Sequence, residues 1–188
     1  MTKRPQALRP TLRLAGAGAA VACLATACSA DARSAADWRA AHPELPSTLV
    51  RGVSWPGAHP ERIEARGSGF RTVLKFGDDD DADQGAIVWV APAATDPCRV
   101  MPTFVTDGAT PADPRLLGST TDTAVSCTPA GRDAWTLHAT GSDRSGYAVR
   151  RDGVLLVLTT TDDWTDPDYP SIARTLHPLD DRELSALL

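Results

Sequence analysis

The feature that most constrains the fold of this chain is an Asp-Gly pair set between two strand-like runs in its last third. Asp152 and Gly153 separate residues 147–151 from residues 154–158, and Asp-Gly is one of the pairs that a two-residue hairpin turn prefers. The second run is apolar at every position, as in a strand that is buried on both faces. The sequence therefore predicts an antiparallel hairpin whose second strand needs a covering helix.

The C-terminal end of the chain supplies that cover. We expect helices over residues 169–176 and 180–188. Asp180 and Glu183 have the spacing of a capping box, with Asp in place of Ser or Thr, and such a box indicates the start of a helix. Three leucines fall on one face of the second helix and would pack on the sheet; they are Leu184, Leu187 and Leu188.

Other strand-like runs precede the hairpin. Residues 70–76 and 86–91 are rich in Val, Ile, Phe and Trp and flank a polar segment, so they predict a hairpin with an acidic tip. Further candidates are residues 99–106, 123–128, 134–140 and 146–150. With residues 154–158 they make about seven antiparallel strands. We therefore predict an α+β domain, mainly an antiparallel twisted sheet with C-terminal helices packed on it.

The segment before these strands looks irregular. Residues 34–41, around Trp38, predict one or two helical turns, whereas residues 42–69 contain four prolines and four glycines and predict mostly loop or short extended pieces. Trp55 is expected to pin this loop to the core. We divide the chain into an N-terminal segment 1–27, a tether and irregular segment 28–69, and a single globular domain 70–188.

The N-terminal segment has the pattern of an export signal. Residues 1–13 carry four basic residues and no acid, and residues 14–27 are uncharged and rich in Ala, Gly, Leu and Val. The uncharged run is shorter than the ~20 apolar residues that a membrane-spanning helix needs. It is therefore expected to be a signal peptide that is removed.

Small residues before a cysteine then indicate lipidation. The stretch Leu24-Ala25-Thr26-Ala27-Cys28 resembles the lipobox of bacterial lipoproteins, in which the cysteine sulfur takes a diacylglycerol before cleavage. The resemblance implies that Cys28 is the lipidated first residue of a mature chain anchored on the extracytoplasmic face of the cell membrane. Cys23 is a second candidate, but lipidation there would leave Cys28 as an odd exposed thiol.

Two cysteines remain in the rest of the mature chain. Cys98 and Cys127 form an even pair, and an exported protein meets an oxidising compartment, so we predict a structural disulfide between them. A redox pair is the alternative, but it usually needs Cys-x-x-Cys spacing, which is missing.

Charge narrows the range of partners. The chain has 19 Lys and Arg, four of them in residues 1–27, against 24 Asp and Glu, so the mature chain has a formal net charge of −9. Nucleic acids and anionic headgroups demand a basic patch, so we expect no nucleic-acid partner and membrane association through the lipid. The high ratio of Arg to Lys and the abundance of Ala suggest a high-GC Gram-positive source.

The acidic tip suggests a calcium site, but the spacing of its acidic residues does not match that of an EF-hand loop. If Asp79, Asp81 and Asp83 are the first ligands of an EF-hand loop, Gln84 stands where Gly is required and Val90 where Glu is required. A looser site would need the acids of residues 162–168 at the same pole. We expect a solvated loop, no metal and no cofactor.

Catalytic patterns are missing as well. The chain has no Gly-x-Ser-x-Gly, and its histidines show no metal-ligand spacing; they are His42, His59, His138 and His177. We predict that the protein is not an enzyme. Its five tryptophans could line a sugar-binding surface, but Trp89 and Trp135 lie in predicted strands, where packing is the better explanation.

The last third also resembles a known kind of domain. A Tyr-bearing strand, an Arg-Asp-Gly turn, an apolar strand, an Asp- and Pro-rich loop and a helix, within residues 144–177, look like the end of the extracytoplasmic sensor domains of some mycobacterial serine/threonine kinases. Those domains build a twisted sheet backed by helices. We expect a non-catalytic binding or regulatory module that meets an envelope protein, with small-ligand or metal binding as the alternative and hydrolysis as a third.

Overall fold

The computed structural model describes residues 34–77, 84–104, 120–141, 144–161 and 167–188, which all belong to one compact unit, Asp31–Leu188. Residues Met1–Ala30 form a separate unit outside the described residues. The elements of the described unit are α1 (Ala35–Ala41), the 3-10 helix η1 (Ser47–Leu49), β1 (Arg51–Gly52), β2 (Ala58–Arg66), β3 (Gly69–Phe76), β4 (Gly85–Pro92), β5 (Val100–Phe104), β6 (Thr120–Gly131), β7 (Ala134–Ala139), β8 (Ser145–Arg151), β9 (Val154–Thr160), α2 (Tyr169–Ala173), β10 (His177–Pro178) and α3 (Asp181–Ala186).

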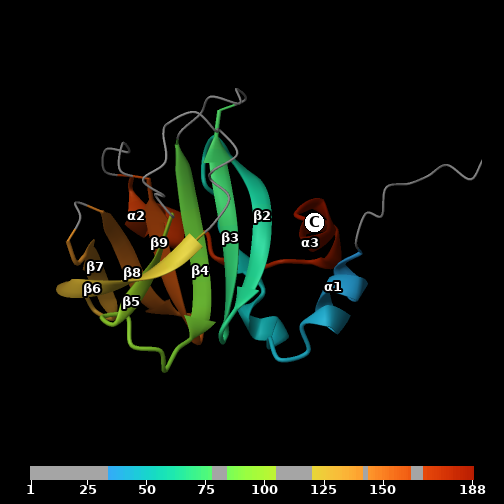
Figure 1. Cartoon of the computed structure of the whole chain (residues 1–188), viewed down its shortest axis with the longest axis horizontal. Coiled ribbons are helices and arrows are strands. Elements are labelled where there is room, and N and C mark those ends of the chain that lie inside the picture. Colours follow the sequence, from blue (N-terminus) through green and yellow to red (C-terminus); the bar gives the residue numbers. More distant parts are fainter. Residues whose placement is uncertain (1–33, 78–83, 105–119, 142–143, 162–166) are drawn as a thin grey trace, which may run out of the picture. The chain divides into compact units, whose positions relative to one another are not determined.

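The main structure is a curled antiparallel sheet of eight strands in the order β2-β3-β4-β9-β8-β7-β6-β5 (Figure 1). Strands β1 and β10 form a separate antiparallel pair on top of it. The predicted α+β class is confirmed, and each of the seven predicted strands is present. Strands that follow one another in the sequence are neighbours in the sheet, apart from β4 and β5.

Strand β2 corrects the prediction that residues 42–69 are mostly loop. It runs for nine residues and pairs antiparallel with β3, with a register shift between Pro60 and Arg62. The reason it was missed is that β2 is an edge strand. A proline and charged side chains are tolerated at an edge, because one row of backbone groups needs no partner strand.

The hairpin of β8 and β9 forms as predicted. Asp152 and Gly153 both have positive φ, 50° and 79°, as a type I′ turn requires, and Arg151 pairs with Val154 across it. A positive φ costs Gly nothing and Asp little, so the local sequence and the strand pairing agree.

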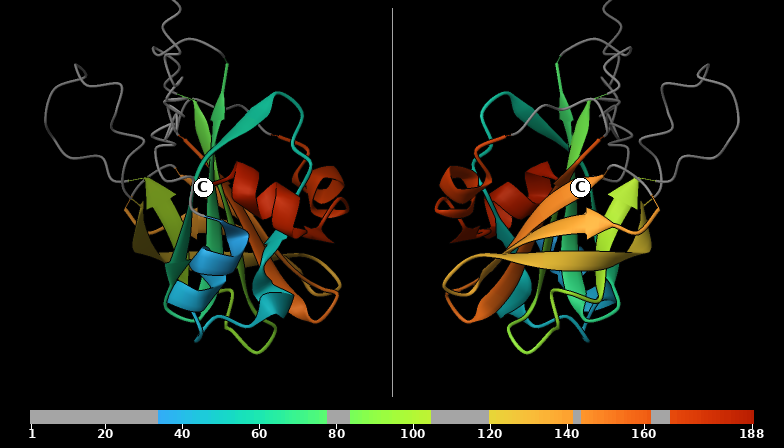
Figure 2. Two further views of the ribbon diagram at one scale, coloured as in Figure 1. Left: turned by 90° about the vertical axis from the view of Figure 1, so that its right-hand side faces the viewer. Right: turned by 90° about the vertical axis from the view of Figure 1, so that its left-hand side faces the viewer.

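Strand β9 is buried on both faces, as its composition predicted, but the two covers differ. Val154, Leu156 and Leu158 pack in the cluster that the helices cover, whereas Leu155 and Val157 pack in a second cluster with residues of β5 and β7. Figure 2 shows the helices in front of the sheet in one view and the strands β5–β7 in front in the opposite view. The second face is thus closed by the sheet curling over itself.

The helices that cover the first face begin at well-formed caps. Ser34 with Asp37 and Asp180 with Glu183 make capping boxes for α1 and α3, which confirms the predicted box at Asp180. Leu184 is fully buried under α3, whereas Leu188 stays exposed. Hydrogen bonds from the Ser171 side chain and backbone lower the pKa of Asp168, the N-cap of α2.

The predicted disulfide is present. Cys98, in the turn between β4 and β5, is bonded to Cys127 in β6. The two cysteines are 29 residues apart in the sequence, so the bond closes a long loop and holds the curled end of the sheet.

Candidate functional site

A cavity of about 340 Å³ lies between the sheet and the segments that cover its first face. Ligand pockets in proteins are typically ~300–1,000 Å³ and mostly apolar, with a few polar groups that orient the ligand. The floor comes from β2, β3 and β4, and the walls come from the segment around β1, from β10 and from α3. The lining residues are Gly52, Val53, Ser54, Trp55, Ala58, Pro60, Thr72, Leu74, Val88, His177, Leu179, Glu183, Ala186 and Leu187.

Thr72 is the polar residue of the cavity floor. Side chains alternate along β3, so Thr72 shares the covered face with Phe70 and Leu74, which belong to the apolar cluster under the helices. The residue is 5% exposed, and its hydroxyl oxygen is buried and has no hydrogen-bond partner. A buried hydroxyl without a partner destabilises the protein that carries it, so it stands out as a group that a ligand could satisfy.

Two ionisable side chains at the rim of the cavity contact each other. His177 Nε2 lies 3.4 Å from Glu183 Oε1, while Nδ1 of the same ring donates to the carbonyl oxygen of Thr175 at 2.9 Å. Glu183 also accepts the backbone N–H of Asp180 at 3.0 Å through its other carboxylate oxygen. The capping box of α3 thereby fixes a carboxylate at the mouth of an otherwise mostly apolar cavity.

The cavity does not assemble a nucleophile and a base. Ser54 lines it together with His177, but the hydrogen bonds of Ser54 run through its backbone, whose N–H is bound by the Thr175 hydroxyl at 2.8 Å. No hydrogen bond among the described residues joins the Ser54 hydroxyl to His177. Nucleophilic catalysis by Ser54 would require those groups within hydrogen-bond reach.

A second polar cluster lies on the opposite face of the sheet. Arg71 in β3 is 1% exposed; its guanidinium donates to the Thr120 hydroxyl and to the carboxylate of Asp122, both in β6. Arg66 donates to the Thr120 carbonyl, and the Thr120 hydroxyl donates to Glu64 at 2.9 Å. The cluster thus joins β2 and β3 to β6, which lies seventh in the sheet order, and clamps the curl of the sheet.

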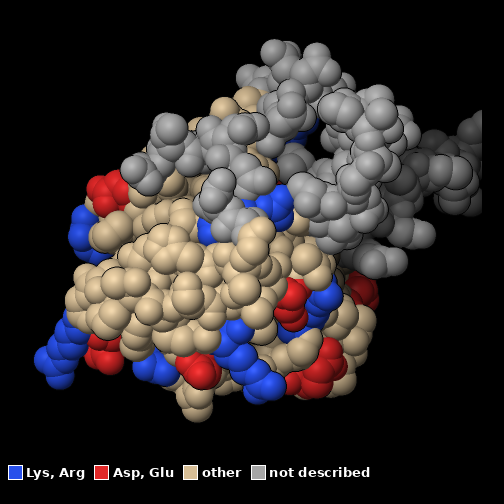
Figure 3. Space-filling model, turned by 60° about the vertical axis from the view of Figure 1, so that its left-hand side comes forward, with Lys and Arg blue, Asp and Glu red and all other residues tan. Residues whose placement is uncertain are grey.

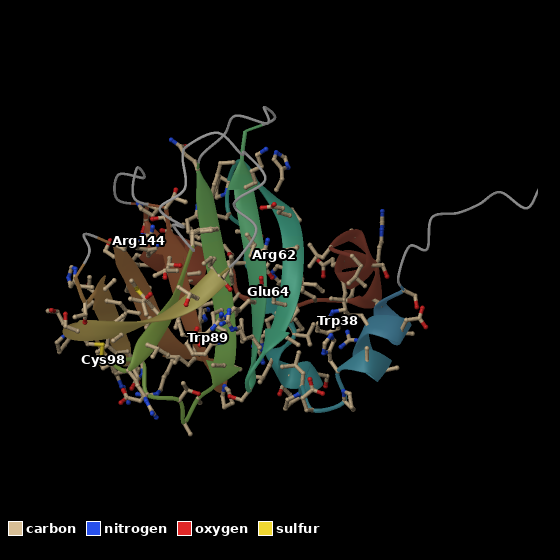
Figure 4. The ribbon with its side chains drawn as sticks, in the orientation of Figure 1. Trp38, Arg62, Glu64, Trp89, Cys98 and Arg144 are labelled. Carbon is tan, nitrogen blue, oxygen red and sulfur yellow. A yellow bond between two sulfur atoms is a disulfide. The ribbon has the colours of Figure 1, made fainter. Side chains whose placement is uncertain are left out.

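Trp89 completes this clamp from β4. The guanidinium of Arg71 lies over the Trp89 ring, 5.4 Å from its centroid, at a cross-strand pair of β3 and β4. The indole nitrogen lies so close to Gly69 that a Cβ there would approach it to 2.1 Å. Figure 4 labels Glu64 on β2 and Trp89 on β4, and β6 passes in front of β4 in that view.

We expect Asp122→Ala to lower the free energy of unfolding by about 2 kcal/mol, because it leaves the buried Arg71 guanidinium without its anion. The cost stays below that of a fully buried pair because Asp122 is 42% exposed. Urea unfolding followed by tryptophan fluorescence would measure it. Asp181→Ala is the matched control, since the Asp181 carboxylate pairs with Arg39 at the surface and is 80% exposed; equal losses in the two variants would contradict the clamp.

The residues singled out from sequence are spread over the molecule. His138 is exposed on β7, His59 lies in β2 and not in a turn, and His177 reaches the cavity. Trp55 is buried and lines the cavity, as expected of a residue that pins its segment to the core. Trp89 is buried and Trp135 half-buried, which confirms packing roles for both.

Other predicted features lie outside the described residues, namely Cys23 and Cys28, the acidic tip 78–83 and most of the acidic segment 162–168. Within the described parts of the chain, no group of three or more His, Cys, Asp or Glu side chains could hold a metal ion. None of the helices described is long and apolar enough to cross a membrane.

The outer face of β5–β7 offers a surface of a different kind. Figure 3 shows a broad uncharged area on this side with charged side chains around it. Strand β6 contributes to it, and Asp122 is its single charged residue. The face is flat and polar, with Thr and Ser side chains, so it offers less to recognise a small molecule than the cavity does.

Comparisons with known proteins add no relative to this description. No family model matches the chain, and searches of curated proteins and of solved structures find no match.

Proposed function

We propose that the mature chain is a non-catalytic binding module, anchored by a lipid on Cys28 to the extracytoplasmic face of the cell membrane, and that it binds a small ligand in the cavity between the sheet and α3. The cavity carries this proposal. It is of ligand size, it is lined mainly by apolar side chains, and a few polar groups converge on it, as in small-molecule sites generally.

The small-ligand form of the hypothesis is favoured over the metal form. The cavity has two ionisable lining residues, His177 and Glu183, and they already engage each other. Hard cations need several oxygen ligands, which the apolar lining does not supply. An envelope protein, such as a signalling protein, is the partner we propose for the domain itself, because a lipid anchor would raise its local concentration at the membrane.

A fluorescent probe tests the cavity. N-phenyl-1-naphthylamine is uncharged and brightens in apolar sites, so we expect it to bind the unlipidated mature chain, residues 28–188 with Cys28→Ala. Ala186→Trp should abolish the signal, because Ala186 is an exposed lining residue at the mouth and a bulky ring there obstructs the cavity.

The control is Ala130→Trp, the same change at an exposed position in β6 that does not line the cavity. It should leave probe binding intact. If the Ala186 and Ala130 variants bind the probe as well as the parent protein does, the cavity is not the binding site and the proposal is wrong.

A further inference from the structure

We infer that the cavity selects an uncharged amphiphile, an apolar molecule with a single uncharged oxygen such as an alcohol, and that the Thr72 hydroxyl is the group that recognises this oxygen. The inference rests on the proposed function and adds to it the chemical class of the ligand. Three features of the lining support it.

The first feature is the apolar body of the cavity. Trp55, Leu74 and Val88 are buried and form its inner part, while Leu179 and Leu187 close the side under α3. Contact with these side chains favours a hydrocarbon, because burying apolar surface is the main source of affinity in such a site.

The second feature is the unpaired hydroxyl at the floor. Thr72 Oγ1 is buried and has no partner within the protein, although the residue lines the cavity. A threonine side chain has staggered χ1 positions that place either the hydroxyl or the methyl group toward a given neighbour, so the proposal requires the χ1 position that turns Oγ1 to the ligand. A hydroxyl both donates and accepts, so it suits an alcohol, an ester or an amide oxygen equally.

The third feature is the charge at the mouth. The ionisable side chains of the lining are His177 and Glu183, and no Lys or Arg is among the lining residues. A carboxylate ligand would lose its hydration in the apolar body of the cavity and would find no Lys or Arg among the lining residues to compensate it, and the Glu183 carboxylate at the mouth would repel it. An ammonium ligand gains little from Glu183, because the Glu183 side chain is 46% exposed and water screens its charge.

Competition against the bound N-phenyl-1-naphthylamine tests the selectivity with three probes of one chain length. We expect 1-octanol to displace it at concentrations at least fivefold lower than octanoate or octylammonium. The Glu183→Gln variant should bind octanoate several-fold better and octanol unchanged. Asp181→Asn is its matched control, because Asp181 lies on α3 but does not line the cavity, and it should change neither.

Thr72→Val tests the recognising group. The variant keeps the shape of the side chain and loses the hydroxyl, so octanol should bind about fivefold more weakly, the worth of one hydrogen bond. The ligand-free variant should be as stable as the parent protein or more so, because the lost hydroxyl had no partner. Thr72→Ser should retain the octanol preference. Thr103→Val, on β5 outside the cavity, should leave octanol binding unchanged.

The outcomes separate the two proposals. If the naphthylamine binds but octanol and octanoate compete equally, or Thr72→Val leaves octanol affinity unchanged, the ligand class is wrong while the binding cavity stands. If the naphthylamine binds and none of the three compounds displaces it, the ligand class is again wrong. If the naphthylamine itself binds independently of Ala186→Trp, the proposed function fails first.

Discussion

Cys28→Ala should release the protein completely from the membrane fraction. If Cys28 carries the diacylglycerol, its two acyl chains are the anchor, and two chains hold a protein stably where a single chain gives only marginal binding. Fractionation with an antibody, together with metabolic labelling by radioactive fatty acid, would measure the loss.

Cys23→Ala is the matched control, because Cys23 lies five residues earlier and is also preceded by small residues. It should leave both labelling and membrane association at the level of the parent protein. Acyl label that persists in the Cys28 variant and disappears in the Cys23 variant would transfer the lipidation site to Cys23. Label that persists in both single variants would contradict Cys28 as the lipidated residue.

Loss of the disulfide should produce the largest change in stability. In the chain-entropy description, a bond that closes a loop of this length stabilises the folded state by roughly 3–4 kcal/mol. We expect the double variant Cys98→Ala, Cys127→Ala to lower the free energy of unfolding by about that amount, measured in urea on the unlipidated mature chain. The bond joins the turn after β4 to β6, so the curled end of the sheet should open first.

Reductant supplies the internal control. Dithiothreitol should destabilise the parent protein by about as much as the double variant is destabilised, and it should have no effect on the variant. If the parent protein reacts with a thiol reagent without prior reduction, or if the double variant keeps the parent stability, the bond does not staple the fold.

Both faces of the sheet depend on side chains whose roles the local sequence did not reveal. Thr72 lies in a strand-like run that also contains Arg71 and Lys75 and was expected only to be part of a strand; that it lines a cavity follows from the packing above it. The hydrogen-bond partners of Arg71 could not be predicted from the residues around it, because Thr120 and Asp122 lie 49 and 51 residues further along the chain. Glu183 was expected as a helix cap, and it is one, but its position at the cavity mouth comes from how α3 docks.

The spacing of apolar residues, together with the positions of turn and capping residues, predicted most of the strands and all three α-helices. Alternating or continuous apolar runs produce strands because they bury a face, and the Asp-Gly turn at 152–153 sets the register of β8 and β9 locally. The capping box at Asp180 sets the start of α3 for the same reason, since all its hydrogen bonds lie within four residues.

Strand β2 was not predicted because its pattern of proline and charged residues is compatible with a strand only at the edge of a sheet. The same residues, with Pro60 and several charges, would be loop anywhere but at an edge. The packing on the second face of β9 was not predicted for a related reason. A strand that is buried on both faces needs an element packed on each face, but the local sequence does not say whether a helix or another part of the sheet provides it.

The sequence by itself determined the class of fold, the hairpins, the helix caps, the pairing of Cys98 with Cys127 and the expectation of a lipid anchor at Cys28, since each depends on neighbouring residues or on counting cysteines. Only the tertiary structure decided that the sheet curls, that Arg71 and Asp122 clamp it, and that α3 leaves a cavity over Thr72. Those features join residues 49 or more positions apart, and distant contacts depend on how preformed elements pack, which local patterns do not encode.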